Sequence, residues 1–351
     1  SSSGSVVNST KILEVLLNNR VDKDVQSILF PLDLLQIMVL SPKYCIRDNF
    51  ITPNKYLTNF VSIVWIMFCS AFFVYRPILE GTAYREPVNI GIILHYLSIF
   101  DAFFFSIGLA IYFIFNTAER NITFVLTLQK IHRFFSNKIN NKKIMLGNWI
   151  SVILIFSYFI GIMLLVVFYF VEFRTWPVFI TTIILFTFDV NMIYAIRLII
   201  MLKDYVVLWN SQVLHPLNLY NSKAYCEQLL KTYINIMECY KYFKSYIQPL
   251  TFKFMFFVHI ALLRNMVLLT ALCVHCESFY TEIKNSLNSC SLILSTNYDQ
   301  KRLCWNVHRL YRATFTKIRL MGLADVDAVL PLEVLGLYAD YMIVMLQFAF
   351  L

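Results

Sequence analysis

The C-terminal segment, residues 330–351, carries polar side chains at a spacing that would suit the wall of a water-filled path. It reads LPLEVLGLYADYMIVMLQFAFL, and Asp340, Val344, Gln347 and Leu351 recur at intervals of four, three and four residues. A helix places residues at these intervals on one face. Because lipid cannot satisfy a polar side chain, Asp340 and Gln347 would face protein or water in a membrane. The stripe therefore indicates either a pore wall or a hydrogen bond from Gln347 to a neighbouring helix.

Carboxylates also occur inside apolar runs, but no group of residues suggests catalysis. Asp101 and Asp189 lie in such runs, where they could bind a cationic ligand or pair with a basic residue such as Arg264. The six histidines are isolated, and the chain has no Gly-rich phosphate loop or nucleophile elbow. Cys273 and Cys276 have CxxC spacing but no second pair. We therefore expect no enzyme activity, no cofactor and no metal site.

The composition requires an apolar environment around much of the chain. Hydrophobic residue types make up 59% and charged types 15%, against about 45–50% and about 25% in soluble proteins. The net charge is +9, but the basic residues lie in connections between apolar runs. This arrangement indicates membrane topology, so membrane lipid is an expected partner and nucleic acid is not. The eight dispersed cysteines are expected to be reduced.

Hydropathy predicts an all-α polytopic membrane protein with six clear spans. Each apolar run is long enough to cross the hydrocarbon core, which takes about 20 residues. The runs are residues 57–75, 88–115, 148–170, 177–202, 251–274 and 330–351. A shorter run, Ile28–Leu40, is predicted to lie in the membrane interface or to pack against the bundle. The spacing of apolar residues predicts two long amphipathic helices below the membrane, at 222–250 and 286–321.

The charge of the connections orients these spans. Residues 116–147 carry six Lys or Arg against a single acid, Glu119, so the positive-inside rule places this connection in the cytosol. The N-terminus is then cytosolic and Pro177 is outside. A single span at 251–274 would place the basic segment Arg302–Arg319 outside the cell, which the same rule disfavours.

The end of the chain resembles a known family. Tyr341 is followed by five apolar residues, Gln347 and Phe348. This pattern is similar to the terminal signature of insect gustatory receptors, in which threonine and tyrosine precede five hydrophobic residues, glutamine and phenylalanine. The stretch RATFTKIRLMGLADVDAVLPLEVLGLYADY, residues 312–341, resembles the bitter-type receptors of moths and butterflies. So do FPLDLLQ and YCIRDNFITPNKY near the N-terminus, whereas the middle of the chain resembles the family only in its pattern of spans.

The resemblance implies a seven-helix subunit of a tetrameric, ligand-gated, non-selective cation channel, as in this family and the related insect odorant receptors. It implies a multi-pass protein of the plasma membrane with a cytosolic N-terminus and an extracellular C-terminus. By motif alignment the gate falls at Val344, Gln347 and Phe348. The expected partners are permeant cations, a small-molecule tastant of the plant secondary compound class, and other subunits, either identical (a homotetramer) or related.

The resemblance and the hydropathy together divide the chain into four parts. They are a cytosolic N-terminal segment with a short interfacial helix (1–55), four spans forming a ligand-binding bundle (56–205), cytosolic anchor helices with the remaining span or spans at 251–275 (206–328), and a pore-lining C-terminal helix (329–351). The ligand is expected in the outer half of the bundle. The candidate contacts there are His95, Tyr96, Asp101, Tyr169, Trp176, Thr181, Thr182 and Asp189.

Two features depart from the family pattern. Asp340 replaces the usual threonine; fourfold symmetry would make it a ring of carboxylates in the pore, unless it pairs with a basic group of a neighbouring subunit. The family has seven spans and hydropathy gives six, so the outer half of helix five is expected to be missing near Lys253–His259.

Two other classes of membrane protein remain as alternatives. A secondary transporter would couple ligand flux to an ion gradient. A G-protein-coupled receptor would carry an acidic-Arg-Tyr motif after the third span and Asn-Pro-x-x-Tyr in the last span, and the last span here has no Asn-Pro-x-x-Tyr.

Overall fold

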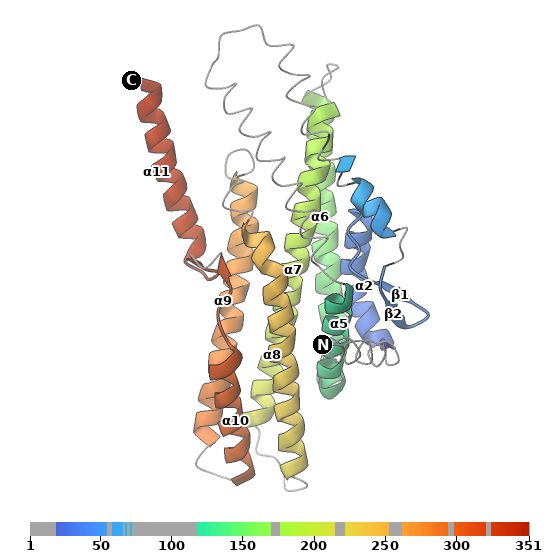
Figure 1. The fold of residues 1–351 in the computed structure, drawn as a ribbon, viewed down its shortest axis with the longest axis vertical. Helices are drawn as coiled ribbons and strands as arrows, with labels where there is room; N and C mark the ends of the chain where they lie inside the picture. Colours follow the sequence, from blue (N-terminus) through green and yellow to red (C-terminus); the bar gives the residue numbers. More distant parts are fainter. Residues whose placement is uncertain are drawn as a thin grey trace, which may run out of the picture.

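The computed structural model of the chain is predominantly helical and describes residues 19–54, 58–65, 67–68, 71, 118–169, 176–214, 222–252, 262–293, 298–320 and 324–350 (Figure 1). The helices are α2 (Lys23–Met38), α5 (Ala118–Phe135), α6 (Asn141–Tyr169), α7 (Trp176–Leu214), α8 (Ser222–Phe252), α9 (Leu262–Ile293), α10 (Tyr298–Thr314) and α11 (Leu330–Phe350). Two short antiparallel hairpins accompany them, β1 (Cys45–Arg47) with β2 (Phe50–Thr52) and β3 (Arg319–Leu320) with β4 (Ala324–Asp325). The predicted all-α class is confirmed in this coarse sense.

The helices α7, α8, α9 and α10 form a long bundle around an aromatic core. On α8, the predicted amphipathic spacing is confirmed, because Tyr233, Ile236, Tyr240 and Phe243 are all buried. The Tyr240 ring stacks on Phe279 of α9 with centroids 5.0 Å apart. At the lower end, the indole N–H of Trp209 donates to the backbone oxygen of Leu229 at 2.9 Å, so this buried polar atom is satisfied.

The second predicted amphipathic helix, 286–321, is wrong as a single element. Its first part belongs to α9, which ends at Ile293, and α10 then runs back along α8 and α9 and ends at Thr314 (Figure 1). Beyond Thr314 the backbone is extended and leads into β3. Its polar groups are bonded by side chains of other helices, such as the Tyr240 hydroxyl, which donates to the Thr316 oxygen at 2.9 Å. These long-range bonds favour the extended backbone over further helix.

The run 251–274 is divided between two helices. α8 ends at Phe252 and α9 begins at Leu262, and the two run in opposite directions (Figure 1). The predicted break near Lys253–His259 lies outside the described residues. α7 is continuous across residue 205, so the predicted boundary between bundle and anchor falls inside one helix.

The N-terminal helix α2 packs against the bundle. It contacts α6 and α7, and its face formed by Val25, Ile28, Leu29 and Leu32 is buried. Of the two positions predicted for the run at 28–40, packing against the bundle is therefore confirmed. The connection at 116–147, predicted as a basic loop, is mostly helical, because it contains α5 and the start of α6.

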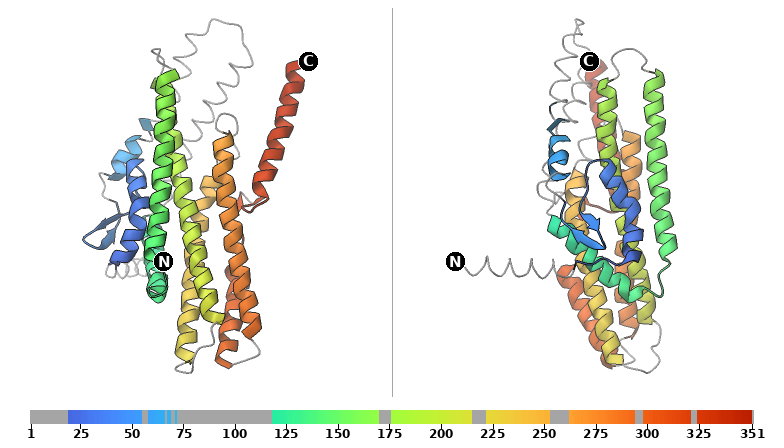
Figure 2. Two further views of the ribbon diagram at one scale, coloured as in Figure 1. Left: turned by 180° about the vertical axis from the view of Figure 1, so that it is seen from behind. Right: turned by 90° about the vertical axis from the view of Figure 1, so that its right-hand side faces the viewer.

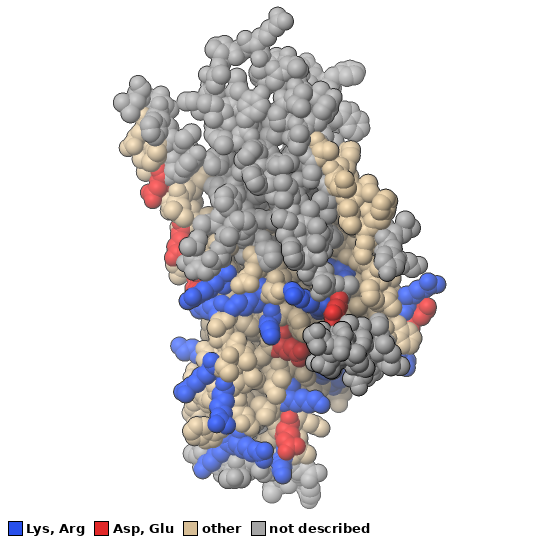
Figure 3. Space-filling model, in the orientation of Figure 1, with Lys and Arg blue, Asp and Glu red and all other residues tan. Residues whose placement is uncertain are grey.

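Within the described residues, two helical stretches are long and apolar enough to cross a membrane. The first is Asn141–Leu164, and 17% of the residues in its most apolar part are buried. The second is Met266–Leu292, where the buried share is 39%. The first lies in α6 and matches a predicted span. The second lies in α9 and extends beyond the predicted end of the run at Val274. On the face shown in Figure 3, the visible Lys and Arg side chains lie over the lower part of the molecule.

Candidate functional site

Within the described part of the chain, the C-terminal helix α11 packs mainly through its base. Leu330 and Val334 are buried, and among the described elements α9 is the main neighbour of α11. Farther along, Leu335, Leu337 and Ile343 are 48%, 58% and 53% exposed. Figure 1 and the left view of Figure 2 show α11 leaning away from α9 toward the C-terminus. An apolar helix with so much exposed surface requires lipid or other protein around it.

The predicted pore residues lie on this exposed helix. Asp340, Val344 and Gln347 are all exposed and share one face of α11. Asp340 forms no ion pair within the described part of the chain. Phe348 belongs to α11, but its side chain is outside the description, as is all of Leu351. The arrangement places a carboxylate and an amide on one exposed face of the helix.

A polar cluster connects the base of α11 to the bundle. We call it the junction: the segment 316–320 with 324–327, and the side chains of Tyr240, Lys244, Glu277 and Tyr280 that bind it. The Tyr280 hydroxyl accepts the Ile318 N–H at 3.3 Å and donates to the Val326 oxygen at 3.2 Å. The Val326 N–H donates to the Ile318 oxygen at 2.8 Å. One α9 side chain therefore holds both arms of the β3–β4 hairpin.

Lys317 is the charged centre of the junction. Its Nζ donates to Oδ2 of Asp327 at 2.9 Å and lies 3.5 Å from Oε2 of Glu277 and 5.6 Å from the Tyr280 ring centroid. The hydrogen bond to Asp327 raises the pKa of Lys317. Burial tends to raise the pKa of Asp327, but the bonds from Lys317 and the Val329 N–H outweigh it and the pKa is lowered. Both groups are thus held in their charged forms.

Asp327 and Lys244 extend the junction to α11 and α8. Oδ1 of Asp327 accepts the Val329 N–H at 3.0 Å, immediately before α11 begins. On the other side, Nζ of Lys244 donates to Oγ1 of Thr316 at 2.6 Å and to the Lys317 oxygen at 3.0 Å. The junction therefore links α8, α9 and α11 through one short segment.

Lys317 and Asp327 lie in the family-like stretch 312–341, but the sequence assigned no role to them or to Lys244, Glu277 and Tyr280. The bonds from Tyr280 join residues 38 and 46 positions apart, and those from Lys244 join residues 72 and 73 positions apart. No local spacing rule connects residues at such distances. The one available signal was chemical: Lys317 and Asp327 are opposite charges on either side of Gly322.

The predicted ligand contacts are described only in part. His95, Tyr96 and Asp101 lie outside the described residues. Tyr169 is in α6, and Trp176, Thr181 and Thr182 are in α7, but their side chains are not described. Asp189 is buried in α7, with an exposed fraction of 1%. It lies seven residues after Thr182, roughly 10 Å along the helix.

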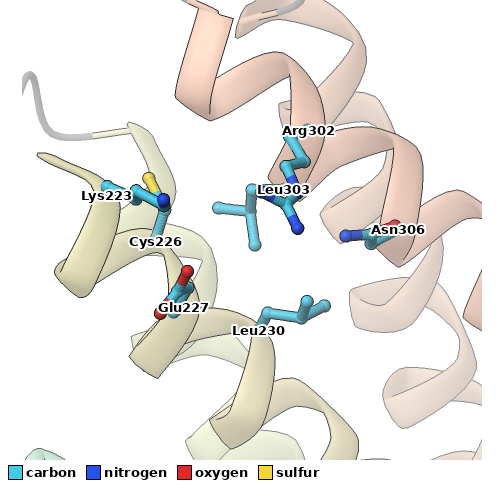
Figure 4. A pocket seen from close by; sticks show the side chains of 7 residues that line it. All are labelled: Lys223, Cys226, Glu227, Leu230, Arg302, Leu303 and Asn306. Atoms are coloured by element: carbon cyan, nitrogen blue, oxygen red, sulfur yellow. The ribbon is translucent and has the colours of Figure 1, made fainter.

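A small cavity of about 60 Å³ lies between α8 and α10, far from these predicted contacts in sequence. Figure 4 shows Leu303 pointing from α10 toward α8, with Glu227 on the facing helix and Arg302 beside Leu303. Small-molecule sites usually measure about 300–1,000 Å³. This cavity therefore has room for a few waters and not for a tastant.

Comparisons with known proteins assign no relative. No family model matches the chain, and no curated protein matches its sequence. Among the described residues, no cluster of His, Cys, Asp and Glu could hold a metal ion.

Proposed function

We propose that the chain is a subunit of a ligand-gated, non-selective cation channel of the insect gustatory-receptor type. The observation that carries the proposal is the exposed α11, on which Asp340, Val344 and Gln347 share one face while most other residues of the helix are apolar. Such a helix is suited to line a shared pore in an assembly of four copies, with its apolar faces against lipid and neighbouring subunits. The family-like motif around Tyr341–Phe348 supports the same conclusion.

The proposed topology places the subunit in the plasma membrane. A cytosolic N-terminus agrees with the positive-inside rule, and Asn141–Leu164 with the upper part of Met266–Leu292 supports membrane spans in α6 and α9. Seven spans and an extracellular C-terminus are what the resemblance implies. The lower bundle of α7 to α10 then lies in the cytosol, where it holds the tetramer. A tastant bound among the first four spans would act on α11 through this bundle and the junction.

Whole-cell recording from cells that express the chain alone tests the proposal. A panel of plant secondary compounds should evoke a passive cation current in some wells, and Gln347→Ala should change its ion selectivity or gating. The control is Lys231→Gln, an exposed substitution on α8 remote from α11 in sequence. Ligand uptake that depends on an ion gradient, with no passive current, would instead identify a transporter. A response that requires a G protein would instead identify a G-protein-coupled receptor.

A further inference from the structure

A buried lysine lies between two tyrosine rings and belongs neither to α11 nor to the junction. Lys43 precedes β1 and is 8% exposed. Its Nζ is 3.5 Å from the ring centroid of Tyr194 on α7 and 3.7 Å from that of Tyr246 on α8. These distances are typical of cation–π contacts. Among the described residues, however, this Nζ has no hydrogen-bond partner.

The two rings compensate only part of the penalty for burying this amine. An ammonium group can donate three hydrogen bonds, and a buried charge without them is strongly disfavoured. Burial accordingly lowers the pKa of Lys43. The nearby acid, Asp33, accepts a hydrogen bond from the Tyr44 hydroxyl at 2.6 Å, and burial raises its pKa to about 7. Burial therefore disfavours the carboxylate form of Asp33, and among the described residues Asp33 and Lys43 form no ion pair.

A cavity of about 30 Å³ opens beside Lys43, and its polar lining is rich in donors. Arg120 and Asn121 of α5 and Ser245 of α8 line it together with Lys43, and no acidic side chain of the described residues does so. Nη1 of Arg120 lies 3.5 Å from Oγ of Ser245. Nδ2 of Asn121 donates to the Lys43 backbone oxygen at 3.4 Å, which ties α5 to the loop that carries the lysine.

We infer that this pocket binds the phosphate group of an anionic lipid at the cytosolic boundary of the membrane. Lys and Arg are the two residue types that bind phosphate most effectively, Lys as a compact charge and Arg through its fork of donors. The volume has room for about two water-sized groups, which suits two oxygens of one phosphate and excludes a bulky headgroup. The rest of the lipid stays outside the cavity.

The assignment to a lipid rests on the proposed membrane orientation. Lys43 precedes the predicted span at 57–75, and Arg120 follows the predicted span at 88–115. Ser245 lies near the end of α8, whose last residue, Phe252, falls in the apolar run at 251–274. The pocket is thus made by segments that approach or leave the predicted spans on the side where the basic connection places the cytosol.

Binding to the purified full-length chain in detergent tests this inference with three probes. Dioctanoyl phosphatidic acid carries both the phosphate and the acyl chains, dioctanoylglycerol carries only the chains, and inorganic phosphate carries only the anion. The thermal midpoint of the protein is followed as each probe is added. We expect phosphatidic acid to raise the midpoint saturably, dioctanoylglycerol to leave it unchanged, and inorganic phosphate to act only at much higher concentration.

Substitutions in the pocket test whether the lipid binds at this site. Arg120→Gln changes an exposed residue and leaves the core intact, and Lys43→Met keeps the length of the buried side chain. Each should weaken the phosphatidic acid effect about tenfold, as expected for loss of one hydrogen bond to a charged group. The control, Lys231→Gln, removes an exposed charge of α8 that does not line the pocket.

Equal effects of phosphatidic acid and dioctanoylglycerol would overturn phosphate recognition. Equal affinity for inorganic phosphate would overturn the lipid assignment in favour of a free anion. Unchanged phosphatidic acid binding in Arg120→Gln would exclude this pocket. Because the assay measures binding without current, a chain that conducts no ions can still bind the lipid, so failure of the proposed channel function is distinguished from failure of this inference.

Discussion

Removal of the Lys317–Asp327 contact should change ligand sensitivity without changing the conducting pore. The substitution Lys317→Met keeps a long side chain but removes the charge that lies 2.9 Å from Oδ2 of Asp327. It leaves the face of α11 that carries Asp340, Val344 and Gln347 intact. The junction joins the bundle to the base of α11 alongside the direct packing of Leu330 and Val334, so weakening it should alter how the bundle moves that helix.

The magnitude follows from the exposure of the pair. Hydrogen bonds to charged groups contribute about 1.5–3 kcal/mol, whereas exposed ion pairs contribute about 0.2–1 kcal/mol. The Lys317 and Asp327 side chains are 36% and 18% exposed, so we expect about 1 kcal/mol. If the contact exists in only one gating state, this corresponds to about a fivefold shift of the open–closed equilibrium and of the half-maximal ligand concentration.

The assay is whole-cell dose–response recording combined with single-channel conductance. A double-mutant cycle of Lys317→Met and Asp327→Asn isolates the coupling between the two residues. The matched control is the Arg319–Asp325 pair of the same hairpin, whose side chains are 68% and 36% exposed, and it should couple by less than about 0.5 kcal/mol. An altered conductance in Lys317→Met, or equal coupling in the two pairs, would refute this account of the junction.

The response of this pair to pH follows from the two pKa shifts. Because the pKa of Asp327 is lowered, its contribution to stability is present above its ordinary value near 3.8 and is lost as the pH falls through the lowered value. The pKa of Lys317 is raised, so its contribution is present below its ordinary value near 10.5 and is lost as the pH rises through the raised value. Between these limits the contact should remain, and the gap in half-maximal ligand concentration between the native chain and Lys317→Met should stay constant from about pH 6 to about pH 8.

Three further predictions concern the pore and the packing. Asp340→Asn should lower cation conductance or weaken divalent block while ligand sensitivity stays normal; unchanged permeation there, alongside altered permeation in Gln347→Ala, would remove Asp340 from the pore. Tyr280→Phe removes the hydroxyl that joins Ile318 to Val326 and should lower stability by about 1–3 kcal/mol in thermal unfolding, whereas Tyr242→Phe, whose hydroxyl lies 3.4 Å from Glu238, should have little effect; equal losses would contradict the role of Tyr280. Gly147→Ala would place Cβ 2.6 Å from Nη2 of Arg197 and push that guanidinium away from its 2.7 Å hydrogen bond to Oδ1 of Asn148. Gly161→Ala on the same helix meets nothing within 4 Å, so only Gly147→Ala should lower the thermal midpoint.

The sequence was sufficient to predict elements whose signal is local. Helical spacing placed Tyr233, Ile236 and Tyr240 on the buried face of α8, and the burial of these residues confirms it. The apolar run around Ile28 indicated a helix, and its burial against α6 decided between two possible positions. The face shared by Asp340, Val344 and Gln347 followed from their spacing alone.

Features that depend on distant residues could not be predicted in this way. The helical spacing of apolar residues in 286–321 continues past Thr314 in the sequence. In the structure, Tyr240 and Lys244 bind the backbone at Thr316 and Lys317 and stabilise an extended segment there. The cation–π contacts of Lys43 likewise require the rings of Tyr194 and Tyr246, which the packing of α7 and α8 brings together. Hydrophobic periodicity carries no information about such contacts.

Within the described structure, α11 leans away from the bundle above its base (Figure 1), which gives it the geometry of a lever. Its 21 residues extend for about 30 Å from the junction. Gln347 lies 17 residues beyond Leu330, roughly 25 Å from the pivot. A rotation of about 5° at the base would therefore displace Gln347 by about 2 Å, which is most of the diameter of a water molecule, about 2.8 Å. The junction itself would move by only a fraction of an ångström. Four such arms around one axis would open or close a narrow aperture with very little rearrangement of the bonds that hold them.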